Sequence, residues 1–113
     1  MNTDQVEQKY KFVVMRSFMR ALVEGSTIIE LDEKIAENDD MRNERYKFWK
    51  QVALYALYCA QEKTAGKVIT MLVTVFPVCV QQDFGSGDER DLMDKMKSSL
   101  IGKFEADFVE GKL

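Results

Sequence analysis

The residues whose types and spacing best suit chemistry are a set of carboxylates that recur at helical intervals. Their oxygens are the ligands that Mg²⁺ prefers, and a magnesium-dependent nucleotide hydrolase would use such a set. The set consists of Glu30, Glu33, Glu37 and Asp40. Magnesium sites of this kind draw their carboxylates from two packed helices, whereas these acids share one segment that ends at residues 38–40. We therefore favour a solvated acidic helix face, expect neither a metal site nor a cofactor, and keep the hydrolase as the least favoured hypothesis.

A second pattern interleaves basic and aromatic residues. Lys9-Tyr10-Lys11-Phe12 is repeated in type by Arg45-Tyr46-Lys47-Phe48. Basic groups can bind a phosphate while neighbouring rings stack on a base. On a helix, however, the two aromatics of each segment point in different directions, which is typical of amphipathic helices with lysines at their edges. Nucleotide or RNA binding is thus the second hypothesis, and its anion-binding residues would be Arg42, Arg45, Lys47, Tyr10 and Tyr46.

Lys9, Arg16 and Arg20 fall on one stripe of the first expected helix. Like charges four residues apart on a helix repel by about 0.2–0.5 kcal/mol unless something neutralises them. The acidic segment 30–40 could do so by folding back within one chain or by meeting the stripe on a second subunit. We favour such a contact between protein surfaces over an anionic ligand, and both arrangements remain open.

The composition narrows the chemistry further. Histidine is absent, which removes the usual general base and the commonest zinc ligand, and no catalytic residue is expected. The net charge of −3 does not indicate a polyanion-binding tail. Cys59 and Cys79 lie in apolar surroundings, which predicts free buried thiols in a reducing cytoplasm. Residues 1–5 show no secretion signal, which also favours a cytoplasmic protein.

The elements that must position these residues are predicted to be helices. Thr3 or Asp4 can cap a first helix that runs to about Glu24, with Gly25 as its stop. Thr27 and Glu30 fit a capping box that opens a short helix from Ile28 to Glu37. Further along, the apolar period predicts one helix over residues 41–65, ended by Gly66, and a last helix over 86–110 that opens on a capping box of Ser86 and Glu89.

The apolar run 67–82 decides the architecture. It is too short and too interrupted to span a bilayer, which needs about 20 residues, and no second convincing strand exists to pair with it. As a helix it has one thin polar edge and is apolar elsewhere, which predicts burial. The edge consists of Lys67, Thr70, Thr74, Pro77 and Gln81. We therefore expect a central buried helix over 68–82, kinked or restarted at Pro77.

Some apolar residues fall outside the faces that one core can hide. Leu54, Leu57 and Tyr58 lie on the polar side of their helix, and Met93 with Met96 could line an adaptable groove for a partner helix. With Lys9, Arg16 and Arg20 they form the expected partner-binding set.

The sequence thus predicts a single all-α domain over 1–113, a compact bundle of four long helices and one short helix. The favoured function is that of a non-enzymatic regulator, inhibitor or assembly subunit that binds another protein and self-associates. A dimer is the favoured oligomeric state.

Overall fold

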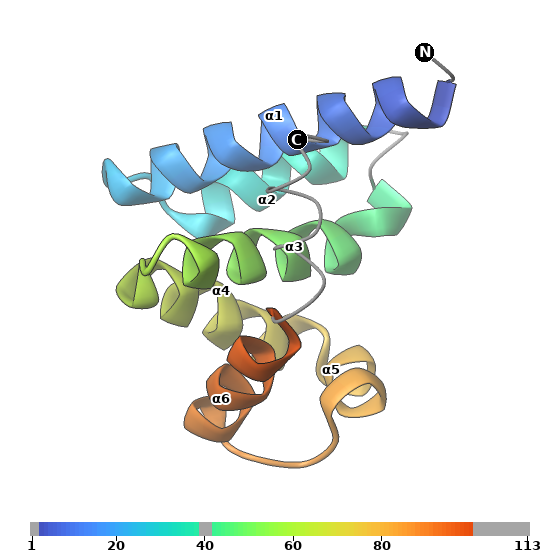
Figure 1. Ribbon diagram of the computed structural model, residues 1–113. Helices are drawn as coiled ribbons and strands as arrows, with labels where there is room; N and C mark the ends of the chain where they lie inside the picture. The colour runs from blue at the N-terminus through green and yellow to red at the C-terminus, as the bar shows by residue number, and fades with distance from the viewer. Residues whose placement is uncertain (1–2, 39–41, 101–113) are drawn as a thin grey trace.

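The chain folds into helices joined by short loops (Figure 1). The structure is a computed structural model that describes residues 3–38 and 42–100, with the backbone alone over 3–12. Its elements are α1 (Thr3–Val23), α2 (Ile28–Glu37), the short 3-10 helix η1 (Arg42–Glu44), α3 (Arg45–Tyr58), α4 (Glu62–Val75), α5 (Pro77–Phe84) and α6 (Glu89–Leu100). The all-α prediction is confirmed, although the division into helices differs from the expected one.

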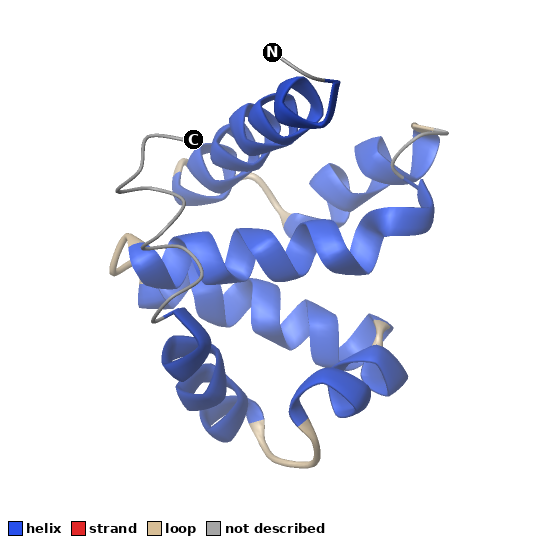
Figure 2. Cartoon of the chain, turned by 45° about the vertical axis from the view of Figure 1, so that its right-hand side comes forward, coloured by secondary structure: helices blue, strands red, loops and turns tan. Residues whose placement is uncertain are grey.

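Helix α3 lies at the centre of the molecule. Helices α1 and α2 cover one side of it, and α4 packs along the other, with α5 and α6 beyond (Figures 1 and 2). Its buried side chains cover about two-thirds of the helix circumference: Phe48, Trp49, Val52, Ala53, Leu54, Ala56 and Leu57. The central position predicted for the segment 68–82 therefore belongs to α3.

The junction between α1 and α2 follows the sequence signals. Gly25 adopts φ +112°, a conformation that glycine adopts without the steric penalty of a side chain. Its amide donates to the Leu22 carbonyl at 3.2 Å, and the Ser26 amide donates to the Ala21 carbonyl at 2.9 Å, which completes a Schellman motif. The Thr27 hydroxyl then accepts the Glu30 amide at 3.2 Å and caps α2. The stop at Gly25 and the start at Ile28 are confirmed.

The single helix predicted over 41–65 is wrong. Helix α3 ends at Tyr58, and Ala60 takes φ +58° before α4 begins at Glu62. The amides of Ala60 and Gln61 donate to the carbonyls of Leu57 and Ala56, at 3.0 and 2.7 Å, so the helix end is satisfied without a glycine. Gly66, the predicted stop, lies inside α4.

The apolar run 67–82 also forms two helices. They meet at Phe76 with a bend of 110°, and Pro77 begins α5, as a restart there requires. The predicted polar edge from Lys67 to Gln81 is exposed. Burial is confirmed for the α4 half, which places Val68, Ile69 and Leu72 in the core, whereas Val80 is the one fully buried residue of α5.

Within the two described ranges, no single helix is long and apolar enough to cross a membrane. Helices α4 and α5 reach that length and apolarity only when they are taken together, across their bend.

Helix α6 begins at Glu89, and Asp88 caps it in place of the predicted Ser86. The Asp88 carboxylate accepts the Asp91 amide at 2.9 Å, while its carbonyl accepts the Leu92 amide at 3.0 Å. An ionised cap also interacts favourably with the positive end of the helix dipole, which a serine does not. The predicted continuation over 101–110 lies outside the described residues.

Candidate functional site

Three of the expected partner-binding residues are core residues. Leu54, Leu57 and Met96 keep 3%, 7% and 0% of their surface exposed, so the prediction that they bind a partner is wrong. The reason is that α3 has neighbours on both sides, so its second apolar face is buried within the same molecule. Tyr58 is 43% exposed and Met93 is half-buried, and these two reach the surface.

Among the described side chains, the structure gives one ion pair to the acidic segment, and it does not involve the basic stripe. Arg16 and Arg20 are exposed on α1, and Lys9 lies in the part of α1 where only the backbone is described. The ion pair formed by the acidic segment runs from Asp32 on α2 to Arg45 on α3, both of which belong to this chain. The outward acids Glu30 and Glu33 remain exposed.

Arg45 is held by Asp32 and by an aromatic ring. Its Nε donates to Asp32 Oδ1 at 3.0 Å, its Nη2 donates to Oδ2, and its guanidinium carbon lies 5.3 Å from the centre of the Phe76 ring. Trp49, which is fully buried, donates its Nε1 proton to the same Asp32 Oδ1 at 2.9 Å. Burial alone would raise the pKa of Asp32, but these hydrogen bonds and the charge of Arg45 outweigh it and hold that pKa below its usual value. Arg45 is therefore an internal clamp between α2, α3 and the α4–α5 bend.

Tyr46 is engaged in the same way. Its hydroxyl donates to Asp83 Oδ2 at 2.5 Å and lies 3.2 Å from the Cys79 carbonyl, while its ring packs 5.8 Å from that of Phe76. Burial, followed by the hydrogen bond to Asp83 and the charge of that carboxylate, raises the pKa of Tyr46. The nucleotide-binding hypothesis thus relies on two residues, Arg45 and Tyr46, that the fold already uses. Its Arg42 and Lys47 are exposed, and Tyr10 lies where only the backbone of α1 is described.

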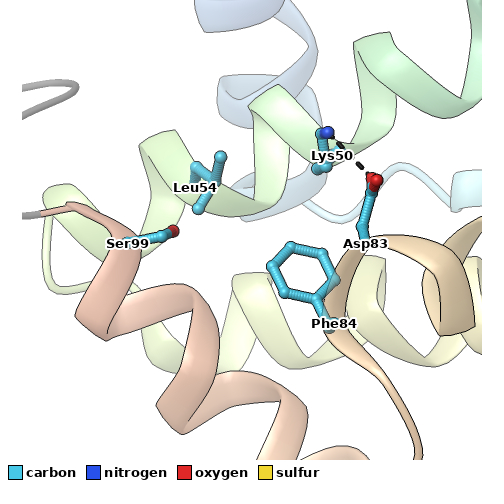
Figure 3. A pocket seen from close by; sticks show the side chains of 5 residues that line it. All are labelled: Lys50, Leu54, Asp83, Phe84 and Ser99. Atoms are coloured by element: carbon cyan, nitrogen blue, oxygen red, sulfur yellow. Dashed lines mark hydrogen bonds and ion pairs between the residues drawn. The ribbon is translucent and has the colours of Figure 1, made fainter.

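A pocket of about 220 Å³ opens beside this cluster (Figure 3). Lys50 Nζ donates to Asp83 Oδ2 at 3.0 Å and closes one end, while the Phe84 ring and Leu54 supply apolar walls and Ser99 lies across from Phe84. Ligand pockets for drug-sized molecules measure about 300–1,000 Å³, so this one is small. Its ion pair joins α5 to α3 beyond the α4–α5 bend.

Among the described residues, no group of three or more acids or cysteines is arranged to hold a metal ion. Glu30, Glu33 and Glu37 point outward from α2, and Asp40 lies outside the described residues. The geometry offers nothing that favours the magnesium-dependent hydrolase.

The exposed apolar residues mark surfaces that the sequence pattern did not single out. Val75 and Val78, exposed by 47% and 66%, flank Pro77 at the bend, and we name these three residues the apolar corner. The signal that could have found them is the proline itself, because a helix that restarts at a sharp bend leaves apolar residues without a neighbour on its outer side.

A second exposed set lies on α1 and α2. The α1 stripe consists of Val13, Arg16, Arg20 and Val23, and the α2 stripe consists of Ile29, Glu30, Glu33 and Glu37. Val13, Val23 and Ile29 are 49%, 54% and 71% exposed. Each stripe thus combines charges of one sign with exposed apolar side chains, two on α1 and one on α2.

Comparison with protein-family models, with curated proteins and with solved structures gave no significant match. The function is therefore inferred from the surfaces just described.

Proposed function

We propose that the protein is a non-enzymatic binding subunit, a regulator, inhibitor or assembly factor, that docks a partner protein and also self-associates. The observation that carries the proposal is the apolar corner. Val75, Pro77 and Val78 are adjacent, exposed and presented on a sharp bend. Burying a valine completely stabilises a contact by about 1.5–3 kcal/mol, and a half-exposed one offers roughly half of that.

The corner is backed by rigid contacts. Phe76, between the two valines, packs against the ring of Tyr46 and the guanidinium of Arg45. Asp83, on the following helix, holds Lys50 and Tyr46 of α3. A surface fixed in advance loses little conformational entropy when it binds, which favours its use as an anchor for a partner.

The partner is sought with a bait protein and a matched pair of variants. Val75→Lys with Val78→Lys places two charges on the apolar corner. The control, Gln81→Lys with Gln82→Lys, places two charges on exposed positions of α5, the helix that also carries Val78. Wild-type and control baits are expected to retain from a lysate of the native host a protein that the corner variant loses, as identified by mass spectrometry. Equal retention by all three baits would contradict a role for the apolar corner.

Self-association is tested separately by multi-angle light scattering over a range of protein concentrations. The expected molar mass rises from that of one chain, 13.1 kDa, towards a multiple of it as concentration increases. A mass of one chain at every concentration would remove self-association from the proposal and leave partner binding intact.

A further inference from the structure

We infer that two copies of this chain join through α1 and α2, with the basic α1 stripe of each copy against the acidic α2 stripe of the other. The inference rests on the self-association proposed above and names its surface. It differs from the apolar corner, which lies on the opposite side of α3 (Figure 1).

The α1 stripe is narrow and continuous. At 100° per residue, Val23, Arg16, Arg20 and Val13 follow one another within about 80° of the helix circumference. The buried residues of α1, Met15 and Leu22, lie on the opposite side. The outer face of α1 therefore presents two cations with a large apolar residue at each end. Arg20 is the cation on which the proposal depends most, because Arg16 also interacts with Tyr55 of α3.

The α2 stripe carries the opposite charge, with three carboxylates and one large apolar residue. Ile29, Glu33, Glu37 and Glu30 fall within about 100° of one another, and the buried Leu31 and Ile35 lie on the far side. One residue of the other sign stands at the edge of each stripe, Glu24 beside α1 and Lys34 on α2. The two faces nevertheless keep opposite net charges.

The spacing of the charges matches. Arg16 and Arg20 are one helical turn apart, as are Glu33 and Glu37, and a turn rises about 5.4 Å. When the two helices run antiparallel, Arg20 meets Glu33 and Arg16 meets Glu37. The same register brings Val23 against Ile29, the two exposed apolar residues on either side of the α1–α2 loop. Two ion pairs and one apolar contact thus form together.

A twofold axis then satisfies both copies at once. In an isologous dimer each contact between two residues occurs twice, so a patch must complement itself. Here the apolar pair Val23 and Ile29 lies at the junction of a basic arm, α1, and an acidic arm, α2. Rotation about an axis near that junction places the basic arm of each copy on the acidic arm of the other. It also gathers four apolar side chains at the centre, Val23 and Ile29 from each copy. A patch of one sign would repel its copy instead.

The test reverses one charge at a time. Arg20→Glu leaves the α1 stripe without net charge, and Glu33→Lys reduces the negative charge of the α2 stripe. Each substitution also sets like charges opposite one another in the Arg20–Glu33 pair, so each variant alone should lose the dimer. Both residues are exposed. Lys67→Glu on α4 and Asp94→Lys on α6 are the controls, because each makes the same change of charge at an exposed position off the two stripes. Circular dichroism confirms that every variant is folded.

We expect the dimer dissociation constant to rise about 100-fold for R20E and for E33K, and to stay within about threefold for both controls. An equimolar mixture of R20E and E33K should restore the dimer, since each variant then meets its complement, and so should the double variant R20E/E33K. Light scattering measures all of these. If the wild type is a dimer and R20E and E33K leave its dissociation constant unchanged, this surface is overturned but self-association is not. The same holds if the mixture of R20E and E33K stays monomeric. A wild type that is monomeric throughout overturns both.

Discussion

At the scale of single residues, Asp32 has the largest structural role of the acidic segment. It accepts hydrogen bonds from Arg45 and from the fully buried Trp49. Asp32→Ala leaves the indole N–H without its acceptor and a partly buried guanidinium without its counter-ion, which should lower the free energy of unfolding by about 2–3 kcal/mol. Urea denaturation measures the loss. Glu33→Ala, one residue away and exposed, should change it by less than about 0.5 kcal/mol, and equal effects of the two substitutions would contradict this role.

The same carboxylate predicts a dependence on pH. Its pKa in the folded protein is lowered, since the hydrogen bonds and charge around it outweigh its burial. A lowered pKa contributes stability that is complete above the unfolded-state pKa, about 3.9, and is lost as the pH falls through the folded-state pKa. The difference in unfolding free energy between wild type and Asp32→Ala should therefore shrink from about pH 6 to about pH 3. A difference that stays constant across this range would show that the Asp32 charge makes no contribution.

The Asp32–Arg45 pair also shows where sequence reasoning ends. Periodicity placed Asp32 on a short acidic helix and Arg45 at the start of another, both correctly. Their pairing depends on how the two helices cross, which is set by the core and not by spacing along the chain. For that reason the sequence suggested an anion-binding role for Arg45, and the fold uses it to clamp α2 to α3.

At the scale of elements, the loop between α3 and α4 stores strain. Ala60 adopts φ +58°, a left-handed conformation that costs a residue with a side chain about 1–2 kcal/mol. Ala60 is exposed, so Ala60→Gly removes no packing and should raise the free energy of unfolding by about 1 kcal/mol. Ala36→Gly, inside α2, should lower it by about 0.5–1 kcal/mol, and urea denaturation of both variants gives the comparison. Destabilisation by Ala60→Gly would contradict the strain.

That loop explains why helix boundaries were harder to predict than helices. The ends at Gly25 and Pro77 followed from residues whose backbone preferences are strong. At Ala60 the chain turns without such a residue. The apolar period of α3 continues into α4 in the sequence, so the pattern predicted one helix where the structure has two. The same limit applies to Leu54 and Leu57, since a pattern shows which side chains are apolar but not how many neighbours a helix has.

At the scale of the whole molecule, two exposed surfaces lie on opposite sides of α3. The apolar corner is backed by the contacts of Arg45, Tyr46 and Asp83, which makes it suited to a partner that brings an apolar surface of its own. The layer of α1 and α2 carries its apolar residues among charges of both signs, which suits a copy of itself. A dimer formed by that layer leaves the two corners free, so one assembly could bind two partner molecules.

Salt distinguishes the two surfaces as dimer contacts. Each copy carries a net charge of −3, so two copies repel one another, and salt weakens this repulsion and strengthens an association through apolar residues. Ion pairs between the α1 and α2 stripes have the opposite dependence, because salt screens their attraction. We expect the screening of the ion pairs to outweigh the screening of the net repulsion, since the paired charges are in contact while the net charge is spread over the surface. The dimer dissociation constant should rise about tenfold between roughly 0.05 and 0.5 M salt, as measured by analytical ultracentrifugation. The double variant R20E/E33K exchanges the two charges of the Arg20–Glu33 ion pair but keeps them opposite in sign. Its dissociation constant should therefore depend on salt as that of the wild type does. A dissociation constant that falls as salt is added would contradict ion pairs as the dimer contact and would indicate a contact made by apolar residues, for which Val75 and Val78 are the next candidates.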